Sequence, residues 1–209
     1  MKYLVFLTFS LFLFSCTQSQ QFEGKIVYKN SIKSKLPNMS DERFEEMMGI
    51  NMEYRIKNGY YKSVTDGKLV QWQLYNHGKN RIYTKMSNSE SVLWNDCAVM
   101  MDEVLKTEIN KGVMEILGYE CDELILTCKS GVQKYYYNPV LAVNPDDYKN
   151  HHYANWSAFT EKSNSFPLKM IIENDQFVLT TIATKISPEK IDKKIFELPA
   201  GAVLEKSPY

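Results

Sequence analysis

The three histidines of this chain are the natural place to look for catalytic or metal-binding chemistry. His151 and His152 are adjacent and follow two aspartates at positions 146 and 147, so this segment groups residue types that bind metal ions. Neighbouring residues of an extended segment point to opposite sides, however, and both imidazoles would not reach one ion. We therefore expect His151 and His152 to lie in a solvated loop without metal. His77 precedes a glycine in a turn signal, and we expect it to be exposed.

The sequence carries none of the short motifs that mark common enzymes. It has no glycine-rich phosphate loop, no Gly-x-Ser-x-Gly nucleophile, no Cys-x-x-Cys pair and no His-Glu-x-x-His helix. We therefore predict a non-enzymatic protein that needs no cofactor. The run Tyr135-Tyr136-Tyr137 suits either a groove for a sugar or aromatic ligand, or a strand whose tyrosines alternate between core and rim. We favour the second interpretation.

Four cysteines divide into one near the N-terminus and three in the body of the chain. An oxidising compartment permits one disulfide among Cys97, Cys121 and Cys128 and leaves one thiol over. If residues 119–128 form one strand, Cys121 and Cys128 are seven positions apart and point to opposite faces. We therefore expect a disulfide between Cys97 and either Cys121 or Cys128. Three reduced, buried thiols remain the alternative.

The N-terminus reads as a secretory signal of a lipoprotein. Lys2 is followed by an apolar run over residues 4–14 that is shorter than the roughly 20 residues a membrane-spanning helix needs. The run ends in Leu-Phe-Ser-Cys, which resembles the bacterial lipobox, whose cysteine is acylated and becomes the mature N-terminus. We therefore predict a signal peptide over residues 1–15 and a lipid anchor on Cys16. A released secretory protein with an incidental cysteine is the alternative.

The residues after the anchor bear on where the protein is located. Residues 16–21 form a polar tether without an acidic run. Acidic residues at this place resemble retention or export signals, so their absence favours an outer membrane anchor that faces the periplasm. Exposure on the cell surface stays an alternative.

Composition limits the partners that the chain can bind. Its 25 Lys and Arg residues balance its 25 Asp and Glu residues. A protein without a basic stripe does not displace the counterions of phosphate backbones, so we expect no nucleic acid partner. The aromatic content of 13%, with 14 tyrosines, is typical of strands rather than of helical bundles.

Glycine-containing turn signals divide the chain into short segments with an alternating pattern. Such turns occur at 58–59, 66–67, 77–78, 111–112 and 130–131, and glycine accepts the positive φ that tight hairpins require. Between them, apolar residues occupy every second position, as from Phe22 through Ile26 to Tyr28. In the late segment 178–186 the even-numbered residues form the apolar face. One apolar face per strand indicates an antiparallel sheet that is covered on one side.

Helices are few in this interpretation. Ser40 can cap a helix that begins with two acidic residues and ends at Gly49. Residues 144–148 read as a helical turn begun by a proline, and 96–106 stay ambiguous between helix and strand. The predicted fold is mainly β: a long antiparallel meander with one or two helices that cover its apolar face. We expect a single β domain over residues 22–203 and a C-terminal tail over residues 204–209.

Three segments carry a family resemblance. Ile116–Cys121 (ILGYEC), Ser165–Ile172 (SFPLKMII) and Ile191–Gly201 (IDKKIFELPAG) resemble segments of the GLPGLI family and its lipoprotein-carrier-like relatives among bacterial envelope lipoproteins. The resemblance covers roughly residues 110–201, and the literal GLPGLI string is absent. It implies that the meander is a curved antiparallel sheet or incomplete barrel, a half-barrel-like domain with one or two helices on its concave face. The concave apolar surface would then hold an acyl chain or a peptide of a partner.

Two functions follow as rival predictions. The first is a membrane-anchored periplasmic lipoprotein that binds a lipid-like or apolar ligand in a half-barrel cavity. The alternative is an accessory subunit with a filled core that docks on another envelope protein. A cavity of several hundred Å³ lined by Met, Phe and Ile would favour the first function, and a solid core would favour the second.

Overall fold

The computed structural model describes residues 21–208, and twelve strands of this part form one sheet. The predicted signal peptide 1–15, Cys16 and the tether up to residue 20 lie outside the described residues. The strands are, in chain order, β1 (Gly24–Ser34), β2 (Asn51–Lys57), β3 (Tyr60–Thr65), β4 (Val70–Asn76), β5 (Arg81–Met86), β6 (Val92–Asp96), β7 (Val104–Ile116), β8 (Tyr119–Cys128), β9 (Gly131–Ala142), β10 (Ser165–Asn174), β11 (Phe177–Pro188) and β12 (Leu204–Lys206).

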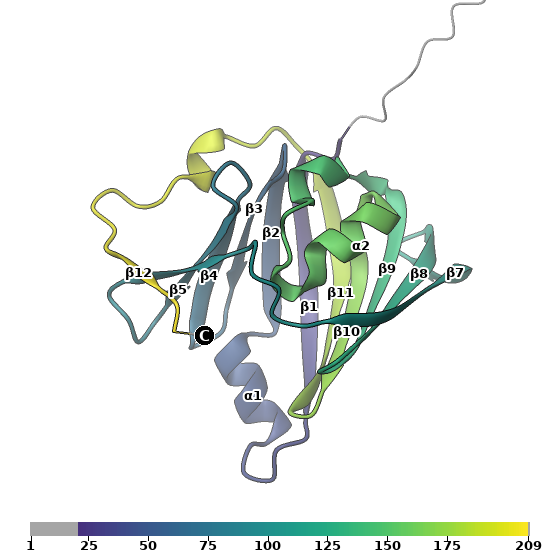
Figure 1. Cartoon of the computed structure of the whole chain (residues 1–209), viewed down its shortest axis with the longest axis horizontal. Helices are drawn as coiled ribbons and strands as arrows, with labels where there is room; N and C mark the ends of the chain where they lie inside the picture. The colour runs from purple at the N-terminus through teal and green to yellow at the C-terminus, as the bar shows by residue number, and fades with distance from the viewer. Residues whose placement is uncertain (1–20, 209) are drawn as a thin grey trace, which may run out of the picture.

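The sheet is a meander in two halves that meet at its first strand. The strand order is β12-β6-β5-β4-β3-β2-β1-β11-β10-β9-β8-β7, so β2 to β6 extend to one side of β1 and β11 to β7 to the other (Figure 1). All neighbours pair antiparallel except β12, which pairs parallel with β6. The sheet does not close on itself. The predicted antiparallel, incomplete barrel is thus confirmed.

The connection between the two halves explains why the sheet curves. β6 and β7 are ten strand spacings apart in the sheet, which in a flat sheet would be about 48 Å at roughly 4.8 Å per spacing. Residues 97–103 join them, and eight residue steps reach at most about 29 Å. The sheet therefore has to curl until its two ends come within reach of this segment. Figure 1 shows the segment crossing in front of the sheet before it enters β7.

Within residues 21–208, two α-helices and three short 3₁₀ turns accompany the sheet. They are α1 (Asp41–Met48), η1 (Pro145–Tyr148), η2 (Tyr153–Asn155), α2 (Trp156–Ser163) and η3 (Lys193–Phe196). In Figure 1, α2 lies in front of the strands around β1 and β10, whereas α1 lies near the lower end of β1. Trp156 and Phe159 of α2 are buried in the main core, so this helix fills part of the concave face.

The predicted local signals around α1 and η1 are confirmed. The Ser40 side chain accepts a hydrogen bond from the Arg43 backbone N–H, and Gly49 with a φ of 92° ends the helix. The Asn144 side chain accepts from the Asp146 backbone N–H at the start of the proline turn. These capping bonds satisfy backbone groups that a helix end leaves open. The ambiguous segment 96–106 contains no helix: β6 ends at Asp96 and β7 begins at Val104.

The hydrophobic core consists of two clusters on opposite faces of the sheet. The main cluster includes Ile26, Tyr28 and Tyr75 and lies on the side covered by α2. The second includes Leu74 and Phe196 and lies under the C-terminal segment with η3. Leu74 and Tyr75 are neighbours on β4 and both are buried, since this part of the sheet is covered on both faces. The expectation of a sheet covered on one side is therefore wrong here.

One β-bulge changes which residues of the last long strand are buried. β11 pairs Lys185 with Val27 but Ala183 with Tyr28, which leaves Thr184 as the extra residue. A bulge of this kind shifts the alternation of side chains by one position. Thr181 and Ala183 are consequently the buried residues of β11, and the prediction that all even-numbered residues of 178–186 share the apolar face is wrong.

The C-terminal residues also differ from the prediction. Residues 204–206, expected to belong to a tail, form β12 and pair with Val92, Leu93 and Trp94 of β6. The preceding backbone contributes as well, because the Val92 N–H donates to the Val203 carbonyl. The tail thereby covers the outer edge of β6, which would otherwise be an unpaired sheet edge. Among residues 21–208, no helix is both long and apolar enough to cross a membrane.

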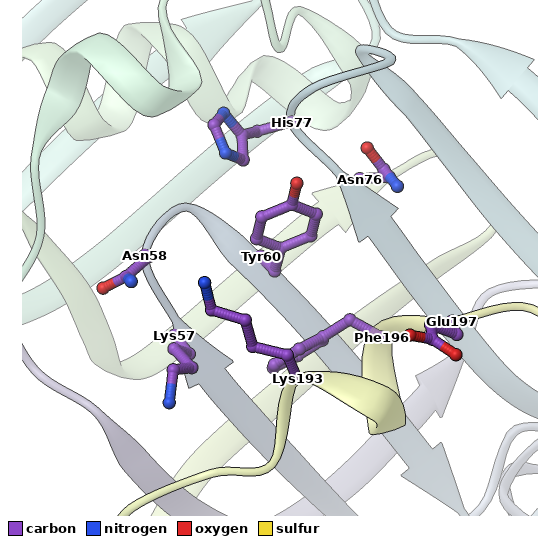
Figure 2. Close-up of a pocket in the computed structure, with 8 residues that line it drawn as sticks. All are labelled: Lys57, Asn58, Tyr60, Asn76, His77, Lys193, Phe196 and Glu197. Carbon is purple, nitrogen blue, oxygen red and sulfur yellow. The ribbon is translucent and has the colours of Figure 1, made fainter.

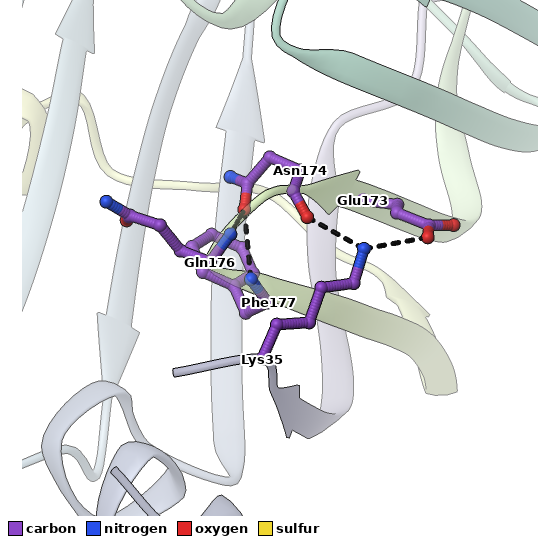
Figure 3. A network of polar contacts seen from close by, with 5 residues as sticks. All are labelled: Lys35, Glu173, Asn174, Gln176 and Phe177. Carbon is purple, nitrogen blue, oxygen red and sulfur yellow. Dashed lines mark hydrogen bonds and ion pairs between the residues drawn. The ribbon is translucent and has the colours of Figure 1, made fainter. Parts of the chain in front are cut away.

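A polar network fastens the β10–β11 hairpin to the end of β1. The Lys35 amine donates to the Glu173 carboxylate at 2.9 Å and to the Asn174 carbonyl at 2.8 Å (Figure 3). The Asn174 side-chain oxygen accepts from the backbone N–H groups of Gln176 and Phe177 and thus forms the turn. The hairpin holds this end of the concave surface in place.

Candidate functional site

The concave side of the sheet contains a cavity of about 240 Å³ between the strands and α2. Its walls come from strands of both halves of the sheet, from the last residue of α1 and from the segment that begins α2. The described residues that line it are Asn30, Met48, Met52, Tyr54, Tyr61, Ser63, Thr65, Val70, Gln73, Ile82, Tyr135, Tyr153, Ala154, Trp156, Met170, Ile172, Leu179 and Thr181. None of them is charged.

The size and lining of the cavity, which should distinguish the two predicted functions, lie between the two expectations. The cavity is contiguous but smaller than the roughly 300–1,000 Å³ of typical ligand pockets. Its walls include three methionines and two isoleucines, and no phenylalanine. Methionine side chains are flexible and adapt to the shape of what they contact. The cavity therefore has room for a small apolar ligand, or for one apolar group of a larger ligand.

Polar groups form a short strip on one wall of this cavity. Thr181 on β11 donates to the Asn30 side-chain oxygen on β1 at 2.8 Å, and both residues are buried. The Asn30 amide donates to the Gly49 carbonyl at 3.1 Å. Ser63 on β3 is also buried and interacts with the Tyr54 hydroxyl. These uncharged donors and acceptors can orient a ligand group inside otherwise apolar surroundings.

Strand alternation explains why these residues point into the cavity. On β1 the buried positions run from Ile26 through Tyr28 to Asn30 and Ile32, so Asn30 occupies an inward position of an apolar face. β10 contributes Met170 and Ile172 in the same manner. Met48 enters from the end of α1, where Gly49 turns the chain into β2. The cavity is therefore assembled from regular elements rather than from long loops.

His151 does not lie in a solvated loop, which corrects the prediction made from its polar neighbours. Its side chain is fully buried. The imidazole stacks on Tyr75 with ring centres 4.0 Å apart and lies 2.9 Å from the Tyr61 hydroxyl through Nε2. The 3₁₀ turn that ends at Tyr148 directs it inward, since the His151 N–H donates to the Tyr148 carbonyl. His152 is half-buried and its Nδ1 contacts the Ser157 hydroxyl.

The His151–Tyr61 pair is suited to structure rather than to proton transfer. Burial lowers the pKa of His151 to about 3 and raises the pKa of Tyr61 well above its usual range. Neither group changes its charge near neutral pH, whereas a general acid or base works best with a pKa close to the working pH. The Nδ1 atom of His151 has no hydrogen-bond partner among the described residues. The pair forms the back of the cavity wall, because Tyr61 itself lines the cavity.

The three consecutive tyrosines are buried together. Tyr135, Tyr136 and Tyr137 of β9 all have less than a tenth of their surface exposed, so the expected division between core and rim is wrong. Tyr135 stacks on Phe159 of α2 with ring centres 4.4 Å apart and lines the cavity. The amine of Lys169 lies 4.9 Å from the centre of the Tyr136 ring on the other side of β9. Both faces of this strand are therefore covered.

The structure describes Cys97, Cys121 and Cys128 as free, buried thiols, so the expected disulfide is absent from the described residues. Their sulfur atoms have different surroundings. The Cys121 thiol donates to the Tyr119 carbonyl, and the Cys128 sulfur accepts from the Asn155 amide at 3.3 Å. This arrangement corresponds to the alternative of three reduced cysteines.

A second hollow of about 490 Å³ lies on the outer side of the sheet, beside η3. Figure 2 shows Tyr60 at its centre, the Lys193 side chain directed toward it and the Lys57 amine turned away. The Lys57 amine donates hydrogen bonds to the Glu23 carboxylate and to the Ile191 carbonyl, both at 2.6 Å. The other residues that line the hollow are Asn58, Asn76, His77, Phe196 and Glu197. The hollow is polar, partly open, and built around contacts that attach the C-terminal segment to the sheet.

Comparisons with known proteins provide no family for this chain. No family model matches it, and no curated protein matches it. Among solved structures, an uncharacterised conserved protein from Thermus thermophilus has a TM-score of 0.43 and 6% sequence identity, covering 87% of this chain and 90% of that one. We draw no argument from a likeness this distant. The resemblance to GLPGLI-like lipoproteins stays a prediction. Within residues 21–208, no three His, Cys, Asp or Glu side chains gather where they could hold a metal ion.

The sequence contained signals for some of the cavity residues that were missed. Extending the alternation of β1 by one position would have placed Asn30 on the buried face. Aromatic residues at 148, 153 and 156 flank His151 and could have indicated burial. Thr181 had no such signal, because its inward position depends on the bulge at Thr184.

Proposed function

We propose that this protein is a non-enzymatic envelope lipoprotein that binds a lipid-like or apolar ligand in its concave cavity. The observation that carries the proposal is a contiguous, uncharged cavity on the concave face of a half-barrel, with methionines and isoleucines in its walls. Burial of apolar surface favours binding there by about 25 cal/mol per Å². Anchoring through Cys16 in the outer membrane, facing the periplasm, is part of the same proposal and would keep the cavity close to lipids.

Trp156 provides a local readout for a binding experiment. It lines the cavity, whereas Trp72 and Trp94 pack in the cluster on the outer face. A protein with Trp72→Phe and Trp94→Phe therefore reports on the cavity alone. We expect the uncharged dye N-phenyl-1-naphthylamine to bind saturably and to quench the fluorescence of Trp156.

The matched variant for this experiment fills the cavity. Met170→Trp places a larger apolar side chain on the wall and should weaken dye binding at least tenfold. Met86 is half-buried on β5 and does not line the cavity, so Met86→Trp serves as the control with retained binding. Dye binding that is absent in the parent protein, or equal in both tryptophan variants, would contradict the proposed function.

The anchor has its own test. Replacing Cys16 by serine removes the thiol that acylation requires and should move the protein from the membrane fraction to the soluble fraction. Unchanged membrane fractionation of Cys16→Ser would contradict the proposed lipid anchor but would not bear on ligand binding in the cavity.

A second candidate function, docking on another envelope protein, is favoured by the edge strand β7. This 13-residue strand ends the sheet, and Leu105, Ile109 and Val113 are exposed along it by 61%, 43% and 42%. An unpaired edge can accept a strand of another chain. A photo-crosslinker at Thr107 should then capture one defined partner, and Ile109→Lys should abolish the capture. The absence of a stable partner would count against docking.

A further inference from the structure

We propose that the ligand of the concave cavity is uncharged at the end that lies inside it, as in a long-chain alcohol, ester or amide, and that the cavity discriminates against ionised fatty acids. This inference rests on the proposed function and names its ligand class. It depends on two features of the walls: the distribution of charge and the polar strip formed by Asn30, Ser63 and Thr181.

Two lysines that adjoin cavity residues in sequence, Lys62 and Lys169, point away from the cavity. Lys62 lies between Tyr61 and Ser63 on β3, and its amine is 5.0 Å from the centre of the Trp72 ring, which packs in the outer cluster. Lys169 precedes Met170 on β10, and its amine lies over the Tyr136 ring. The alternation of strand residues thus sends these two positive charges to the other face.

A carboxylate in this cavity would have no cation to pair with. All eighteen lining residues are uncharged. Transfer of an ionised carboxylate from water into such surroundings is strongly unfavourable unless a paired charge and hydrogen bonds compensate for it. A hydroxyl, ester or amide group needs only hydrogen bonds, so the walls favour neutral head groups.

The polar strip offers the hydrogen bonds that a neutral group needs. The Asn30 side chain has two N–H donors and a carbonyl oxygen with two lone pairs. One N–H is bonded to the Gly49 carbonyl and one lone pair to the Thr181 hydroxyl, and no further bond of this side chain occurs within the described part of the chain. The remaining donor and acceptor match a ligand hydroxyl, or an amide, on the buried wall. Met170 pairs with Thr181 across β10 and β11, Met52 lines the same cavity, and both can provide apolar contacts for the attached chain.

The test compares matched ligands that differ only in their head group. Decanol, methyl decanoate and sodium decanoate are titrated at pH 8 against the full-length protein carrying N-phenyl-1-naphthylamine, each below its own aggregation limit. We expect decanol to displace the dye at a concentration at least tenfold lower than decanoate, with methyl decanoate close to decanol. Displacement by decanoate at an equal or lower concentration would overturn the inference while the proposed function stands.

The remaining outcomes are separated in the same titration. Saturable dye binding without displacement by any of the three compounds would overturn the inference alone. A failure of the dye to bind would overturn the proposed function together with it. These results therefore distinguish an incorrect ligand class from an incorrect site.

Two variants separate the cavity walls from the general hydrophobicity of decanol. Met170→Lys adds a cation beside the strip and should reduce the preference for decanol over decanoate at least fivefold; Ile172→Lys replaces it if that protein fails to fold. The double variant Asn30→Leu with Thr181→Val removes both partners of the Asn30–Thr181 hydrogen bond together, so that of the bonded groups only the Gly49 carbonyl loses its donor. This double variant should lower the affinity for decanol at least threefold relative to the affinity for the dye. A preference that stays the same in these variants would overturn the assigned roles of the walls.

Discussion

At the scale of single residues, the most informative side chain is that of His151, which we expected in a solvated loop and which is buried. His151 is an imidazole enclosed by aromatic rings, and its hydrogen bond to Tyr61 joins the segment before α2 to β3. Burial of a neutral imidazole is tolerable, whereas its protonation in the same place is costly. We therefore expect the stability of this part of the cavity wall to depend on pH in the acid range.

The first prediction concerns acid stability. The pKa of His151 is about 3 in the folded protein against 6.5 ordinarily, so the unfolded chain binds the extra proton between these values. Its contribution to stability is complete above pH 6.5 and is lost as the pH falls toward 3, by at most about 1.4 kcal/mol per pH unit. Urea unfolding of His151→Phe should show a shallower loss of stability over this range than the wild type.

The control for this prediction is the neighbouring histidine. Burial is the main cause of the lowered pKa of His151 and the neighbouring His152 a smaller one, so His152→Phe should change the dependence on pH less than His151→Phe does. Equal slopes for wild type and His151→Phe would show that His151 is not buried as a neutral group.

The second prediction concerns the three thiols. Burial raises the pKa of Cys97 to about 12 and the pKa of Cys121 and Cys128 to about 11. Because the thiolate is the reactive form, iodoacetamide at pH 8 should leave all three unmodified in the folded protein. In urea without reductant all three should be alkylated, as peptide mapping by mass spectrometry can measure. Two of these cysteines protected in urea would instead reveal the disulfide that the structure lacks.

At the scale of elements, local patterns predicted more than long-range ones. The roles of Ser40, Gly49 and the proline turn at 145 could be predicted because capping and turn residues act within a few positions. The burial of both faces of β4 could not be predicted, since Leu74 is buried by a C-terminal segment more than a hundred residues away. The cavity was expected only in outline, because its polar strip depends on the pairing of β1 with β11 and on the bulge at Thr184.

The third prediction tests how closely α1 is attached to the hairpin beside it. A Cβ atom on Gly67 would lie only 2.6 Å from the Gly49 nitrogen and would also meet the Met48 backbone. Gly67→Ala should therefore destabilise the protein by about 2 kcal/mol and disturb Met48 in the cavity wall. The measurement is the free energy of unfolding in urea, together with dye affinity.

Gly78 provides the matched control for this substitution. A Cβ atom there would meet the Tyr60 hydroxyl at 3.4 Å and the Asn76 side chain at 3.5 Å, which are ordinary contact distances. Gly78→Ala should change the stability by less than about 1 kcal/mol. A similar loss in both variants would contradict the close approach between Gly67 and α1.

At the scale of the whole molecule, one short connection restricts the shape of the sheet. Residues 97–103 join β6 to β7 near the two ends of the sheet, which requires a curved sheet, and the cavity lies on its concave face. The turns and alternation of the sequence predicted the antiparallel meander, whereas its curvature was expected only from the family resemblance. The covered outer face and the docked C-terminus were not predictable, since both depend on segments that meet only after the sheet has formed.

The central claim is that the concave cavity holds a neutral apolar ligand, and native mass spectrometry of the protein purified from its own membrane tests it most directly. The account predicts an additional mass that dissociates on activation, carries no charge of its own and is lost from Met170→Trp but not from Met86→Trp. A protein that carries no such mass, or that retains it equally in both variants, would contradict the account.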